Sequence, residues 1–172
     1  SDRRDLVAAA KPRTASGGEI QRLAALVLLA YVDRDEAARA AAAMVGDAGL
    51  SPELRLDAFQ VLLTTQSKVE GIRTAIGALE SGDPQRQKLA LRHLAYGPSS
   101  YTRLRDRLTL YVSGAERSSS FSRSGLPIIP EAPPGLKPEH VRPLAGDKDP
   151  EVAAYAGYLL SLLGRGDGLG PL

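Results

Sequence analysis

The sequence contains no cysteine and no tryptophan, and aromatic residues make up only 5% of its 172 residues. The absence of cysteine excludes disulfide bonds and thiolate metal sites, and it leaves the redox compartment open. No segment reaches the roughly 18 apolar residues that a membrane span requires, and no signal peptide is recognisable. Alternating runs of valine, isoleucine or threonine are also missing, so the sequence does not predict β-strands.

The apolar residues that are present, 43% of the chain, are mainly alanine and leucine. Both are strong helix formers, and a core of small alanines favours closely packed helices over a core built on large rings. The length suits one domain, residues 1–172, with a core of its own. Because the first residue is serine, we expect a processed or excised part of a longer product, and the sequence gives no localisation.

One helical segment recurs along the chain, and its clearest copy is residues 51–63, SPELRLDAFQVLL. A serine cap precedes a proline at the first helical position, which is a common helix start. The anchors Gly18, Pro52, Pro84 and Pro150 are 34, 32 and 66 residues apart. An alanine follows each anchor by six places and a leucine by ten, at Ala24, Ala58, Ala90 and Ala156, and at Leu28, Leu62, Leu94 and Leu160. A fixed period in this range predicts stacked helical pairs.

The helices that the periodicity predicts span about 19–32, 34–45, 52–64, 68–80, 84–96, 99–112, 137–145 and 150–163. We expect an irregular segment over residues 1–18, apart from a short helix in its first half, and a tail over residues 164–172. In the helix 19–32, the spacing predicts a single buried face. Its predicted members are Ile20, Leu23, Ala24, Val27, Leu28 and Tyr31, with Leu26 and Leu29 widening it.

The repeat fails over residues 113–135, which are rich in serine and proline and have no sustained period. We interpret this segment as a long loop insertion. It stands where the 33-residue register expects the first helix of a pair, near residue 117. The short helix that follows, with Val141 and Leu144 inward and Pro143 as an interruption, is typical of the second helix of a pair.

The recurring segments resemble HEAT repeats, in particular the short bacterial kind. The residues that carry the resemblance are Asp83, Pro84, Ala90 and Leu94, Asp149, Pro150, Ala156 and Leu160, and Ser51, Pro52, Ala58 and Leu62. It covers about residues 19–163, except residues 113–135. It implies an all-α, right-handed α-solenoid of about four helical pairs, one of them degenerate. Such repeats resemble one another because they stack, so the implied function is general: a non-catalytic protein–protein interaction or scaffold domain.

The charge is uneven, although the whole chain carries only +2. Residues 85–124 hold eight basic side chains against two acidic ones, and Arg103 and Arg107 are four apart, so they share one helix face. The interaction residues that we expect are Arg86, Arg92, Arg103, Arg107, Arg117 and Arg123, with Phe121 beside them. The expected partner is another protein or peptide of acidic character. A solvated arginine-rich face without a partner and nucleic-acid binding by residues 85–124 are the alternatives.

Catalytic signals are weak. The two histidines, His93 and His140, are far apart and lack partners at metal-ligand spacing, so neither a metal nor another cofactor is expected. No nucleophile constellation or phosphate loop is recognisable. A lyase-type HEAT enzyme is a further alternative; it requires a concave pocket with convergent polar groups, which the sequence does not show. The sequence favours a protein that is not an enzyme.

Overall fold

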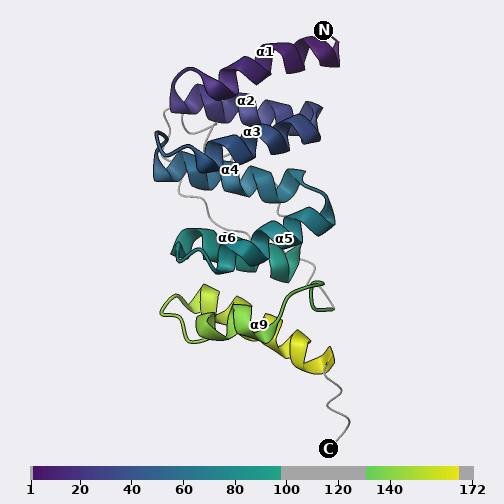
Figure 1. Cartoon of the computed structure of the whole chain (residues 1–172), viewed down its shortest axis with the longest axis vertical. Coiled ribbons are helices and arrows are strands. Elements are labelled where there is room, and N and C mark those ends of the chain that lie inside the picture. Colours follow the sequence, from purple (N-terminus) through teal and green to yellow (C-terminus); the bar gives the residue numbers. More distant parts are fainter. Residues whose placement is uncertain (1, 98–130, 167–172) are drawn as a thin grey trace, which may run out of the picture. The chain divides into compact units, whose positions relative to one another are not determined.

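The computed structural model describes residues 2–97 and 131–166 (Figure 1). These residues form helices and no strand, which confirms the all-α class. They divide into two compact units: residues 2–67, and residues 68–97 together with residues 131–166. Within the described ranges, no helix is both long and apolar enough to cross a membrane.

The first unit consists of α1 (Arg3–Ala15), α2 (Glu19–Val32), α3 (Arg34–Gly46) and α4 (Pro52–Thr65). Helix α2 contacts the other three helices, and α3 packs against both α1 and α4 (Figure 1). The centre of its core contains leucines, small alanines and one valine, namely Leu23, Leu26, Leu29, Ala37, Ala41, Ala58 and Val61. This composition fits the predicted close packing of helices.

Helix α2 has the predicted bounds but buries only part of the predicted face. Leu23 and Leu26 are buried, whereas Ala24 is exposed, and Leu28 and Tyr31 are 39% and 66% exposed. The prediction that Ala24, Leu28 and Tyr31 point inward is wrong, because α2 is covered by α1 as well as by α3 and α4. Burial from more than one side widens the apolar arc around Leu26 and leaves the opposite stripe outside.

The predicted irregular segment 1–18 is largely helical, because α1 continues through Pro12 to Ala15. A proline inside a helix removes one backbone hydrogen bond and disfavours the preceding turn. Tertiary contacts compensate at this end of α1. The side chain of Thr14 is buried, and the Thr14 carbonyl accepts a hydrogen bond of 2.9 Å from Arg22 Nε in α2.

The second unit consists of α5 (Lys68–Leu79), α6 (Pro84–Tyr96), α8 (Pro138–Val141), the 3₁₀ helix η1 (Arg142–Leu144) and α9 (Pro150–Gly166). Helix α6 packs against α5 and α9, while α8 contacts α5, η1 and α9. Buried apolar residues from these elements include Ala75, Ala90, Leu91, Leu94, Val141, Ala156 and Leu159. The predicted inward positions of Val141 and Leu144 are confirmed, and Pro143 lies in the 3₁₀ turn.

Three N-caps form hydrogen bonds within their own helices, and the one at Ser51 confirms the predicted serine cap. Ser51 Oγ and Asp33 Oδ1 each accept from the backbone N–H three residues later, at 3.2 and 3.0 Å. Asp83 Oδ1 accepts two backbone N–H groups at the start of α6. Asp33 forms no full capping box, because its own N–H donates to the Leu29 carbonyl and the Glu36 carboxylate accepts a hydrogen bond of 2.6 Å from Arg39.

The first residues of the helices define the register of the repeat more closely than the sequence did. Helices α2, α4, α6 and α9 begin at Glu19, Pro52, Pro84 and Pro150, which are 33, 32 and 66 residues apart. Gly18 is therefore the N-cap of α2, and the predicted register is wrong there by one residue. The seventh residue of each helix is then an alanine with at most 5% exposure: Ala25, Ala58, Ala90 and Ala156.

Two positions of α5 are open to solvent, and the end of α9 differs from the prediction. Val69 is 61% exposed. At Gly77, an added Cβ would meet no atom within 4 Å, so no neighbour packs closely on this glycine. Helix α9 continues to Gly166, so residues 164–166 are helical and not part of a tail as predicted. The predicted helix 99–112 and residues 113–130 of the predicted loop lie outside the described residues.

Candidate functional site

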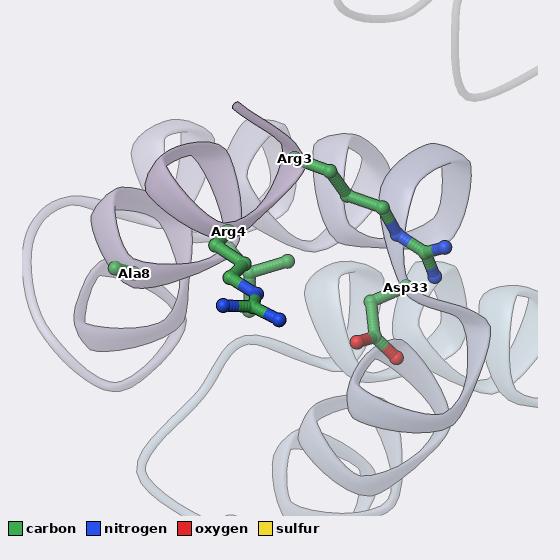
Figure 2. Close-up of a pocket in the computed structure, with 5 residues that line it drawn as sticks. Arg3, Arg4, Ala8 and Asp33 are labelled. Carbon is green, nitrogen blue, oxygen red and sulfur yellow. The ribbon is translucent and has the colours of Figure 1, made fainter. Parts of the chain in front are cut away.

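Two shallow, open grooves lie where the first turns of α1 meet the junction of α2 and α3. The first has a volume of about 420 Å³ and is lined by Arg3, Arg4, Val7, Ala8 and Asp33. Figure 2 shows the side chains of Arg3 and Arg4 extending from α1 toward the side of the groove on which Asp33 lies. One wall is thus formed by the first two turns of α1, and the other by the residue that caps α3.

The second groove has a volume of about 530 Å³ and is lined by Arg3, Leu6, Tyr31, Val32 and Arg34. Because Arg3 lines both grooves, they adjoin at this side chain, and we call the two together the N-terminal groove. Leu6 and Val32 are half-buried, whereas Tyr31 is 66% exposed. The floor of the second groove is therefore apolar, and its rim carries an aromatic ring.

The charged groups around the N-terminal groove differ in whether they have a hydrogen-bond or ion-pair partner among the described residues. Arg3 and Arg4 make no ion pair or hydrogen bond with any described residue. Asp33 is engaged, since its Oδ1 caps α3 through the Glu36 N–H. Arg34 donates from Nη2 to the Thr64 carbonyl at 2.8 Å. The lining residues thus comprise three arginines against one carboxylate, and the carboxylate already accepts a backbone hydrogen bond.

A second polar cluster joins α6 to α9. Lys88 Nζ lies 2.8 Å from Asp149 Oδ2 and 2.7 Å from Glu151 Oε2. The hydrogen bonds to these two carboxylates raise the pKa of Lys88 and lower that of Asp149. Burial alone would raise the pKa of Glu151, but the hydrogen bonds from Lys88 and Tyr155 outweigh it and lower that pKa. We call these residues the Lys88 network.

An aromatic pair extends the Lys88 network. The Tyr155 hydroxyl donates to Glu151 Oε1 at 2.5 Å, and burial together with this contact raises the pKa of Tyr155. The rings of Tyr96 and Tyr155 meet edge to face, with centroids 5.3 Å apart and planes at 87°. Each charge in the network has an opposite charge or a hydroxyl next to it, so the cluster is suited to holding α9 on α6.

The predicted interaction residues fall in two groups. Arg86 Nε lies 3.4 Å from Asp83 Oδ2, and the positive charge of Arg92 is close enough to Glu151 to lower that carboxyl's pKa. Both side chains are half-buried and belong to the surroundings of α6. The other five predicted residues, Arg103, Arg107, Arg117, Phe121 and Arg123, lie outside the described residues.

The two histidines lie in different surroundings. His93 is buried, burial lowers its pKa to about 4, and its Nδ1 has no hydrogen-bond partner among the described residues. His140 Nδ1 accepts a hydrogen bond of 3.0 Å from the Lys137 N–H. Among the residues that the structure describes, no three histidine or carboxylate side chains come together as metal ligands.

The residues of the N-terminal groove were not among the predicted interaction residues. Tyr31 had been assigned to the buried face of the helix 19–32 by its spacing from the other apolar residues of that helix. The signal that identifies its exposure is the alanine column, because an anchor at Glu19 moves the buried seventh position from Ala24 to Ala25. Nothing local in the sequence brings Arg3 together with residues of the α2–α3 junction.

No protein-family model matches the chain, and neither a curated protein nor a solved structure is detectably similar to it. Two features of the described residues therefore bear on function. The N-terminal groove offers arginines without partners and an exposed ring, whereas the charges of the Lys88 network are matched internally.

Proposed function

We propose that the chain is a HEAT-like α-solenoid domain whose role is the non-catalytic binding of another protein, as a scaffold or accessory domain. The regular starts of α2, α4, α6 and α9 support the repeat, and so does the buried alanine at the seventh position of each of these helices. Stacked repeats of this kind present extended surfaces that suit macromolecular partners.

The observation that carries the binding role is the N-terminal groove. Sites for small molecules usually enclose most of the ligand surface. This groove is shallow and open, and it is bordered by Tyr31 and by two arginines without partners among the described residues. Aromatic and arginine side chains are also the residues that contribute most to protein interfaces. An extended segment of a partner protein fits this surface better than an enclosed small molecule does.

The proposed function is tested by selection from a library of random peptides displayed on phage, with the whole chain as bait. An unrelated helical protein of the same net charge serves as the control bait. We expect peptides that bind this chain with a Kd of about 100 µM or tighter and do not bind the control. A selection that enriches no peptide above the control would contradict a peptide-binding role.

Nucleic-acid binding by residues 85–124 is the competing function. Its support is the excess of basic residues in that segment. Lys88, however, lies between two carboxylates, and Arg86 pairs with Asp83, so part of this charge is matched within the protein. Titration with random duplex DNA at several salt concentrations separates the two functions, because phosphate contacts give a steep loss of affinity with salt. The double variant Arg103→Glu/Arg107→Glu should abolish such binding if the segment carries it.

A further inference from the structure

We propose that the N-terminal groove recognises an acidic peptide segment that contains an apolar residue. This inference rests on the proposed function and adds the chemistry of the ligand and the residues that select it. The acidic side chains would pair with Arg3 and Arg4, and the apolar residue would lie against Leu6 and the ring of Tyr31.

Charge complementarity selects an acidic ligand. The guanidinium groups of Arg3 and Arg4 have no partner among the described residues, and both side chains are exposed. Arginine presents a planar fork of donors that matches a carboxylate in a bidentate arrangement. The one acidic lining residue, Asp33, already uses one carboxylate oxygen to accept a backbone hydrogen bond at the start of α3. A basic ligand would be repelled by three arginines and could pair with only one carboxylate.

The apolar part of the groove selects an apolar residue between the acidic ones. Leu6, Val7 and Val32 are half-buried, so each leaves some apolar surface in contact with water. Tyr31 is the most exposed large hydrophobic side chain among the described residues. Covering such surface contributes about 25 cal/mol per Å², and an arginine beside an aromatic ring also allows stacking. A purely acidic ligand would leave this surface uncovered.

The two walls of the groove are held together before any ligand binds. Arg22 in α2 donates to the Thr14 carbonyl at the end of α1, and its Nη2 lies 3.3 Å from Asp47 Oδ2 beyond α3. Lys11 of α1 lies 3.0 Å from the Glu36 carboxylate of α3. These contacts fix α1 on α2 and α3, so little conformational entropy is lost when a ligand enters the groove.

The test measures fluorescence anisotropy of a labelled peptide in which aspartates and glutamates flank one phenylalanine. The variant Arg3→Glu is compared with Arg13→Glu, which makes the same charge change on the same helix. Arg13 is exposed in the last turn of α1 and lines neither groove. We expect Arg3→Glu to weaken binding about tenfold or more, which corresponds to about 1.4 kcal/mol, and Arg13→Glu to change it by less than about threefold.

The apolar contact is tested by Tyr31→Ala, with Val69→Ala as its control. Both side chains are more than 60% exposed, so neither truncation should unfold its helix. We expect Tyr31→Ala to weaken binding about fivefold or more, in the range for an exposed aromatic contact, and Val69→Ala to leave it unchanged. A peptide with serine in place of phenylalanine should lose affinity by a similar factor.

Each outcome separates the inference from the function on which it rests. If the library yields basic or neutral peptides, the chain binds peptides but the acidic ligand is wrong. If Arg3→Glu and Arg13→Glu weaken the acidic peptide equally, the groove is not the site. If random duplex DNA binds as tightly as the peptide and Tyr31→Ala affects neither, the surface attracts polyanions only, and the inference is overturned.

Discussion

Lys88 in α6 and Glu151 in α9 form an ion pair of 2.7 Å across 63 positions of sequence, and the same carboxylate accepts the Tyr155 hydroxyl. We expect Lys88→Met to lower the free energy of unfolding by about 0.5–1 kcal/mol, because the network is partly exposed and screened by solvent. Urea unfolding at low salt, repeated in 1 M NaCl, measures this effect. The difference between the wild type and the variant should shrink in high salt, and an unchanged difference would exclude an ionic origin.

Acid should destabilise the second unit through His93. Its pKa is lowered from 6.5 to about 4 in the folded state because the imidazole is buried. As pH falls from 6.5 toward 4, the unfolded chain binds a proton that the folded chain excludes, so stability is lost in this window. The expected loss is about 1.4 kcal/mol per pH unit and about 3 kcal/mol in total. Urea titrations of His93→Leu should lack this slope, and His140→Gln is the control that should retain it.

Substitution by alanine at two glycines should change the stability of the protein in opposite directions. Gly77 lies inside α5, exposed and with open space at its Cβ position, so Gly77→Ala should stabilise the protein by about 0.5–1 kcal/mol. Gly97 ends α6 with φ +81°, a conformation in which a Cβ is strained. Gly97→Ala should therefore destabilise by about 1–2 kcal/mol. Thermal unfolding of both variants gives the two signs, and equal signs would contradict the assigned conformations.

The register of α2 predicts unequal responses at two neighbouring alanines. Ala25 is 5% exposed, so Ala25→Leu should overfill the space around it and cost about 1–3 kcal/mol. Ala24 is exposed, and Ala24→Leu should change the free energy of unfolding by less than about 0.5 kcal/mol. Chemical denaturation of the pair measures both. The opposite order would restore the register anchored at Gly18.

The helix starts were predictable because they depend on neighbours in sequence. Ser51, Asp33 and Asp83 each cap their own helix, and the hydrogen-bonded partner lies within three residues. Periodicity likewise located α4 and α6 to within a residue. Such local interactions can be recognised in the sequence without knowledge of the tertiary contacts.

The face of α2 and the length of α1 were not predictable in this way. Apolar residues surround most of α2, so periodicity alone does not define which stripe stays outside. The end of α1 depends on a tertiary contact, because Arg22 in α2 donates a hydrogen bond to the Thr14 carbonyl, which follows Pro12 in the chain. The N-terminal groove is harder still, because Arg3 and Arg34 come together only through the packing of three helices.

The four alanines at the seventh helix positions have a consequence for how this protein tolerates change. A methyl group that is fully enclosed in each of α4, α6 and α9, and almost so in α2, leaves no volume for a longer side chain. The substitutions that destabilise the protein most would then fall on alanines, whose side chains carry no functional group. In a saturation mutagenesis experiment, depletion should mark these alanines more sharply than it marks the arginines of the groove.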